Sequence, residues 1–204
     1  MKKLFLASFF KDVANIFAEF EGDLNGKTVT FIPTASRVEK FVFYVNSGRK
    51  ELEKLGMVVD ALEISTASGD EIETKLSNND FIYVTGGNTF FLLQELQRTG
   101  ADKMIAEQVN AGKLYIGESA GAVVTSANIG YVKGMDSVKK APNLTNFDAL
   151  NLVDFYTVPH CTNIPFKKAA KKIIDSYSST LNLCPISNKD AILVNGSDIK
   201  IERN

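Results

Sequence analysis

Short apolar runs alternate along this chain with segments of helical periodicity, and this alternation limits the possible fold more than any other feature. The runs rich in β-branched and aromatic residues are 3–8, 27–33, 58–64, 80–85 and 113–117. Segments between them place apolar residues three and four positions apart, as amphipathic helices do. Strands that alternate with helices form a mostly parallel sheet with helices on both faces. We therefore expect one doubly wound α/β domain over residues 1–204.

The pattern also predicts where the helices and the last strands lie. The helical segments expected are 13–20, 38–55, 88–99, 101–110, 120–127 and 166–177. Residues 131–152 are turn-rich and irregular, whereas 154–159 resembles a further strand. The stretch 185–202 is expected to form two short strands joined at Asn195-Gly196-Ser197, because Asn-Gly is a strong hairpin turn signal.

Composition excludes several classes of partner. The chain has 23 basic and 24 acidic residues and a net charge of -1, which gives no electrostatic reason to expect nucleic acid or an anionic membrane. No apolar stretch is long enough to span a bilayer. The two cysteines, Cys161 and Cys184, have no metal-binding or redox spacing, so we expect reduced thiols in a cytoplasmic protein.

The segment Leu114–Ala122 (Leu-Tyr-Ile-Gly-Glu-Ser-Ala-Gly-Ala) contains the pattern G-x-S-x-G between a predicted strand and a predicted helix. This is the context of a nucleophile elbow, in which a strained turn exposes the serine hydroxyl. The N–H of Ala120 would face a developing oxyanion, and the helix N-terminus favours negative charge there. The sequence predicts Ser119 as a catalytic nucleophile. The alternative is a structural glycine turn with an incidental serine.

A serine nucleophile needs a base, and the chain contains one histidine, His160. It follows the predicted strand 154–159, so we expect it at the same edge of the sheet as Ser119. A lone histidine is more often a surface or core residue, but its pairing with an elbow serine favours a catalytic role. Cys161, directly after it, is interpreted as a packing residue.

The acid that would orient His160 is less clear from the sequence. Asp136 lies in an irregular loop of the kind that carries functional sites, and it is our choice. Asp148 is placed for a turn or a helix cap, and Asp154 opens a strand. Glu118 is next to the nucleophile, but adjacent side chains in a tight elbow usually point apart.

A second glycine turn, Thr85-Gly86-Gly87-Asn88-Thr89, follows the predicted strand 80–85. Asn88 or Thr89 can cap the helix after it. Gly87 lacks a side chain, so its N–H could approach a substrate as the second oxyanion donor beside Ala120. Neither the P-loop nor the dinucleotide-binding glycine spacing is present.

Together these motifs resemble peptidase E, the family of α-aspartyl dipeptidases that is related to the cyanophycinases. The resemblance covers most of residues 80–165. It is carried by Gly86-Gly87-Asn88-Thr89-Phe90, Leu114-Tyr115-Ile116-Gly117, Ser119-Ala120-Gly121-Ala122, Phe147-Asp148-Ala149-Leu150 and Pro159-His160 with Thr162-Asn163.

The resemblance implies a flavodoxin-like fold, similar to class I glutamine amidotransferases. It implies Ser119 as nucleophile, His160 as base, Gly87 and Ala120 as oxyanion donors and Asn88 as a substrate-binding residue. No metal or cofactor would be needed. The best-known activity of the family is removal of an N-terminal aspartate from dipeptides.

The chain departs from the family after its histidine. The aspartyl dipeptidases have a longer loop there, with an arginine that holds the substrate carboxylate. Here Asn163 is followed almost at once by Pro165, and the close cations are Lys167 and Lys168, which do not replace a bidentate arginine. In cyanophycinases the acid follows the histidine, which leaves Asp190 as another candidate.

The function expected is therefore hydrolysis of dipeptides or short peptides through an acyl-enzyme on Ser119, with aspartyl dipeptides as one candidate class. An esterase or amidase acting on small acyl substrates is the main alternative. A non-catalytic ligand-binding relative is another, motivated by the missing arginine. The partner expected is a small peptide, and the chain would act as a monomer or a homodimer.

Overall fold

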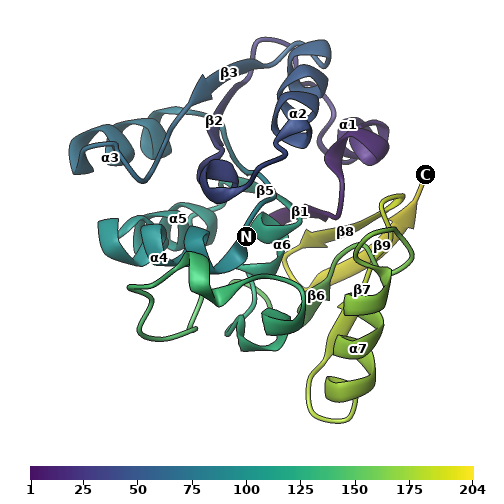
Figure 1. Cartoon of the computed structure of the whole chain (residues 1–204). Coiled ribbons are helices and arrows are strands. Elements are labelled where there is room, and N and C mark those ends of the chain that lie inside the picture. The colour runs from purple at the N-terminus through teal and green to yellow at the C-terminus, as the bar shows by residue number, and fades with distance from the viewer.

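The chain, described over residues 1–204 in a computed structural model, forms nine strands. They are β1 (Lys3–Ala7), β2 (Thr28–Ile32), β3 (Val58–Ala61), β4 (Phe81–Val84), β5 (Leu114–Glu118), β6 (Tyr156–Val158), β7 (Leu183–Pro185), β8 (Asp190–Asn195) and β9 (Asp198–Arg203). Seven of them form one sheet in the order β3-β2-β4-β5-β1-β8-β9 (Figure 1). The first five in this order are parallel. The hairpin of β8 and β9 then adds two antiparallel strands at one edge.

Helices cover both faces of this sheet (Figure 1). They are α1 (Ala14–Glu21), α2 (Phe43–Lys54), α3 (Gly69–Asn78), α4 (Thr89–Thr99), α5 (Ala101–Asn110), α6 (Ala120–Val123) and α7 (Lys167–Tyr177). The buried side chains divide into two clusters, one under α1 and α2 and the other under α3 to α7. The predicted doubly wound α/β fold with a mostly parallel sheet is confirmed.

The strands next to the centre supply both clusters because alternate side chains point to opposite faces. In β5, Tyr115 packs into the larger cluster, whereas Leu114 and Ile116 pack into the smaller one. Both faces of this strand are covered, which explains why its sequence is nearly all apolar.

Three helical segments differ from the sequence-based expectation. The helix predicted from residue 38 begins only at Phe43, because 34–38 forms a 3-10 turn and Phe41 is 77% exposed. Helix α3 was not predicted, and it is capped by the Ser68 hydroxyl, which accepts from the N–H of Glu71. The helix after Ser119 ends at Val123 rather than continuing to residue 127.

The strand predicted at 154–159 forms as β6 but not in the central sheet. It pairs in parallel with β7 in a separate two-stranded sheet. Strand β1 already has β5 on one side and β8 on the other, so the sheet has no free edge there. The chain after β6 nevertheless returns to the carboxyl ends of the parallel strands.

Strand β8 runs against its neighbour β1, and this reversal decides which residues reach the site. In parallel strands the carboxyl ends share one edge of the sheet, and ligands bind outside that edge. A reversed strand presents its amino end at the same edge. The residues just before Asp190 therefore lie beside the residues that follow β1 and β5.

Candidate active site

Ser119 lies in a strained turn between β5 and α6. Its φ of 49° and ψ of -105° are outside the regions that non-glycine residues usually adopt. The turn is close-packed: a Cβ on Gly117 would lie 2.6 Å from the carbonyl oxygen of Gly121, and one on Gly121 would lie 2.1 Å from that of Val84. A side chain at either position would collide with backbone atoms, so only glycine fits there. Ser119 therefore occupies a strained strand-to-helix turn at the position of the G-x-S-x-G pattern.

The glycine turn after β4 packs against this elbow. A Cβ on Gly86 would lie 3.2 Å from the Cβ of Ser119. Gly87 has a φ of 137°, and a side chain there would collide with the Ala35 carbonyl group. The N–H groups of Gly87 and Ala120 donate no hydrogen bond within the protein. Two unused backbone donors thus lie in the turns next to Ser119.

His160 reaches Ser119 from the loop after β6. Its Nε2 lies 3.0 Å from the Ser119 Oγ, which is hydrogen-bonding distance. The backbone N–H of His160 donates to the Ser8 hydroxyl at 3.0 Å, and the imidazole ring stacks on Phe166 with centroids 4.9 Å apart. The structure therefore brings together the two side chains that the sequence singled out.

The environment favours the neutral imidazole. Burial lowers the pKa of His160 below its ordinary value, and the hydrogen bond with Asn188 opposes this shift only in part. A neutral ring can accept the proton of a serine hydroxyl at physiological pH.

Asn188, in the turn before β8, is the partner of the second ring nitrogen. Its Oδ1 lies 2.7 Å from the His160 Nδ1. For Nε2 to accept from Ser119, Nδ1 must carry the hydrogen and donate it to this amide oxygen. Ser119, His160 and Asn188 thus form a relay of the serine–histidine–orienter type, with an amide in place of a carboxylate. Cysteine proteases that use Cys-His-Asn show that an amide can fill this role.

The choice of Asp136 as the orienting acid is corrected by this geometry. Its carboxylate lies at the first turn of α4, where it accepts hydrogen bonds from the N–H and the hydroxyl of Thr89. Burial raises the pKa of Asp136. It faces the glycine turn rather than His160, because the loop that carries it is held against α4.

The other acidic candidates also lie elsewhere. Asp148 accepts from the Asn128 side chain in a turn, and Asp154 is exposed. Glu118 points away from Ser119, accepting from the N–H of Phe10 and the hydroxyl of Tyr83, and burial raises its pKa to about 7.

Asp190 acts on the relay only through the turn that holds Asn188. One of its carboxylate oxygens accepts from the N–H of Ser187 at 2.8 Å, and the other accepts from the Arg203 guanidinium at 2.7 Å. The N–H of Asn188 donates to the Asn163 side chain at 3.0 Å. These contacts hold the turn before β8 at the active-site edge.

The resemblance implies that Asn88 binds substrate, but its side chain is engaged in contacts within the protein. Asn88 is 1% exposed. Its Oδ1 accepts from the N–H of Phe91, which caps α4, and its Nδ2 donates to the Ser137 carbonyl oxygen. The capping role, also expected from the sequence, accounts for its conformation.

Asn188 could not be identified from local sequence, because an asparagine in a polar turn is ordinary. The signal that would have found it is topological. A C-terminal hairpin next to β1 brings the start of its first strand to the catalytic edge. The family resemblance pointed to later acids for the same position but not to an amide.

The structure contains no group of three or more histidine, cysteine or acidic residues placed to hold a metal ion. None of its helices combines the length and the apolar character needed to cross a membrane. Cys161 and Cys184 are not disulfide-bonded, and burial raises the pKa of both thiols.

The family model described as Peptidase family S51 matches residues 4–202. This chain belongs to peptidase family S51. An uncharacterized peptidase of Listeria monocytogenes is 63% identical over 203 residues, which cover 100% of this chain and 99% of that protein. An uncharacterized peptidase of Pasteurella multocida is 58% identical, with 100% and 98% covered. The S51 relationship makes the protein a peptidase, and thus a hydrolase.

Relatives named Peptidase E match a shorter region. The Salmonella arizonae protein is 37% identical over 141 residues, which are 69% of this peptidase and 58% of that protein. A 1.5 Å crystal structure of a Listeria monocytogenes protein provisionally assigned to peptidase E superimposes with a TM-score of 0.97 at 62% identity, covering 100% and 99% of the two chains. A peptidase from an acI-B1 Actinobacterium, at 22% identity and a TM-score of 0.76, shows the same fold.

Proposed function

We propose that this peptidase is a serine peptidase that cleaves dipeptides or short peptides through an acyl-enzyme on Ser119. The observation that carries the proposal is the 3.0 Å contact between the Ser119 Oγ and the His160 Nε2, at an elbow whose backbone is strained. A serine hydroxyl within hydrogen-bonding distance of a neutral imidazole is the pairing of nucleophile and base that serine catalysis requires. The names of the S51 relatives supply the substrate class, a peptide bond.

In the first step, the Ser119 oxygen attacks the carbonyl carbon of the scissile peptide bond while His160 Nε2 accepts the hydroxyl proton. The resulting imidazolium is held through Nδ1–H by the Asn188 amide oxygen. An amide supplies orientation but no negative charge, so the imidazolium is stabilised less than beside a carboxylate. The lowered pKa of His160 is consistent with this arrangement.

The negative charge of the tetrahedral intermediate needs backbone donors. The N–H groups of Gly87 and Ala120 are the candidates, since both flank Ser119 and neither has an acceptor within the protein. Removal of one such donor typically costs about 3–4 kcal/mol of barrier height.

Collapse of the intermediate breaks the C–N bond, and the proton on His160 Nε2 passes to the leaving amine. The acyl group then remains on Ser119 as an ester. A water molecule, deprotonated by the same nitrogen, attacks this ester and releases the second product. Ser119 regains its proton and the cycle closes without a cofactor.

The test is labelling with a fluorophosphonate, which reacts covalently with activated serines, followed by mass measurement of the peptides. We expect one adduct on Ser119, and none in Ser119→Ala or His160→Ala. An exposed serine gives a matched control, and Ser178→Ala should label like the parent. An adduct on another serine, or equal labelling of His160→Ala, would contradict the proposal.

Substrate range is tested with a dipeptide panel that varies the N-terminal residue among aspartyl, neutral and basic types. We expect release of free amino acids by the parent and none by Ser119→Ala. Hydrolysis of aryl esters without cleavage of any peptide in the panel would favour an esterase instead.

A further inference from the structure

Strand β9 forms an open edge of the central sheet. All six of its residues, Asp198–Arg203, are exposed, and its only partner is β8. Figure 1 places it at the side of the sheet opposite β3. Exposed edges are usually protected by short length, charge, proline or a covering element, because their free peptide groups pair readily with another strand. Here Ile199 and Ile201 remain 44% and 54% exposed.

The register of the hairpin shows which peptide groups are free. The N–H of Asn204 donates to the carbonyl oxygen of Lys189, next to the pair Arg203 and Asp190. Hydrogen-bonded and non-bonded pairs alternate in an antiparallel ladder. Even-numbered residues of β9 therefore bond to β8, and Ile199, Ile201 and Arg203 direct their N–H and C=O groups outward.

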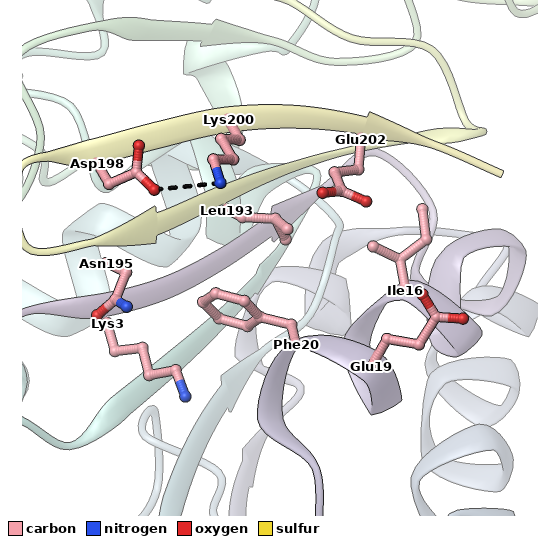
Figure 2. A pocket seen from close by; sticks show the side chains of 9 residues that line it. All are labelled: Lys3, Ile16, Glu19, Phe20, Leu193, Asn195, Asp198, Lys200 and Glu202. Carbon is pink, nitrogen blue, oxygen red and sulfur yellow. Dashed lines mark ion pairs between the residues drawn. The ribbon is translucent and has the colours of Figure 1, made fainter.

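From Asp198 to Glu202 the side chains of β9 alternate between charged and apolar. Asp198, Lys200 and Glu202 lie on the face above α1, where they line a hollow of about 340 Å³ with Phe20 (Figure 2). The Lys200 ammonium lies 3.5 Å from the Asp198 carboxylate, and both are mostly exposed. Such an exposed pair contributes little, so Lys200 can exchange this partner at small cost.

We propose that β9 pairs with β9 of a second copy of this chain, antiparallel about a two-fold axis at Ile201. In this register Ile201 faces the partner's Ile201, and Lys200 faces the partner's Glu202 on both sides of the axis. In such a pair the outward N–H and C=O groups of Ile201 bond to the C=O and N–H groups of the partner's Ile201. The two sheets then become one, and the open edge disappears.

Neighbouring registers are less favourable. A two-fold axis at Lys200 sets Lys200 against itself and Asp198 against the partner's Glu202. An axis at Glu202 sets Glu202 against itself. Like charges directly opposite each other destabilise strand pairs, whereas opposite charges stabilise them. An axis at Ile199 would also set Lys200 against the partner's Asp198, but it would place the turn residues Gly196 and Ser197 against the partner's strand. The charge pattern of β9 is therefore self-complementary along the strand in the Ile201 register. This inference rests on the fold and is independent of the proposed catalytic function.

The first test is the molar mass of the protein by light scattering and sedimentation over a dilution series. We expect twice the mass of the 22.4 kDa chain, and a fall to the mass of one chain on dilution or in Ile201→Lys. Val58→Lys is the matched control, because Val58 is also 54% exposed but lies on the other edge strand, β3. It should leave the dimer intact. A monomer at every concentration, or a dimer that Ile201→Lys does not weaken, would overturn the proposal.

Two further variants test the register itself. Lys200→Glu and Glu202→Lys alone should each weaken the dimer at least tenfold, and the double exchange should restore it. Under oxidation, Ile201→Cys should give a cross-linked dimer, whereas Ile199→Cys, which faces the partner's Arg203, should not. Melting temperatures verify that each variant is folded. Equal cross-linking at both positions, or a double exchange that stays monomeric, would contradict this pairing.

Discussion

The nucleophile and its base are positioned in opposite ways. Ser119 is held by its immediate neighbours in a strained turn. Gly117 and Gly121 flank it, and a side chain at either position would collide with backbone atoms. His160 is held by groups distant in sequence, among them the Ser8 hydroxyl and the Asn188 side chain. The first arrangement is encoded mostly in consecutive residues, and its distant contacts, such as that of Gly121 with the Val84 carbonyl group, are with backbone atoms. The second depends on the whole fold, so it is the part that a distant substitution can disturb.

The largest effect should come from removing either member of the pair. Ser119→Ala and His160→Ala should each lower kcat for peptide hydrolysis by roughly 10⁶-fold, and the double variant should be no worse, since the two act as a unit. Rates from single-turnover assays with a cleaved dipeptide measure this. Additive losses would mean that the two side chains act separately.

Glu118, under the nucleophile, should affect stability rather than chemistry. Its pKa is raised from 4.5 to about 7 by burial, so the folded state binds more protons than the unfolded state between these pH values. The free energy of unfolding should therefore fall as pH rises from 4.5 to 7, by roughly 3 kcal/mol in total from this group.

Denaturant unfolding of the parent and Glu118→Gln measures this loss, because glutamine resembles the protonated carboxyl and should remove the slope. The difference between the two proteins isolates Glu118 from the opposite contribution of His160, whose lowered pKa gives stability that is lost as pH falls. Parallel stability profiles would show that folding does not raise the pKa of Glu118.

Asn188 tests how much the base depends on its distant partner. Asn188→Ala should lower kcat by roughly 10²-fold, because a base that is less well oriented loses part of its contribution to catalysis. The melting temperature should not change. Asn182→Ala, which truncates an exposed asparagine directly before β7, is the control.

Asn188→Asp gives the sharper result. A carboxylate beside Nδ1 raises the pKa of His160, whereas the parent value is lowered by burial. Because only the neutral imidazole accepts the Ser119 proton, the acid limb of the kcat/KM profile should lie below pH 6.5 in the parent and move upward in the variant. An unchanged limb would show that Asn188 does not contact the ring during catalysis.

The smallest effect should come from the pair that holds the Asn188 turn. Arg203 is exposed and Asp190 is buried, and their contact fixes the turn from outside. Arg203→Ala should lower kcat/KM by roughly a few-fold, on the scale of an exposed ion pair, without changing KM. Lys200→Ala serves as the control, because it also removes an exposed positive charge from β9. A rise in KM that exceeds the fall in kcat would place Arg203 in substrate binding instead.

The sequence predicted the parts of this molecule that depend on nearby residues. The strand–helix alternation, the elbow at Ser119 and the C-terminal hairpin all follow from local sterics and periodicity. Chain order and loop character favour Asp136 among the acidic residues, and neither kind of evidence points to Asn188. What decides between them is the reversed direction of β8, which no local pattern records. The sheet of β6 and β7 was missed for the same reason, since it depends on which edges were already occupied.

The late position of the hairpin in the chain has a consequence for synthesis. The residues of the elbow, up to Gly121, are synthesised well before Asn188, and Asn188 is positioned only after β8 and β9 have joined β1. A nascent chain would thus hold its nucleophile for many residues without an oriented base. We expect peptidase activity to switch on in a single step once the hairpin of β8 and β9 has joined β1, which ribosome-stalled chains of increasing length would reveal.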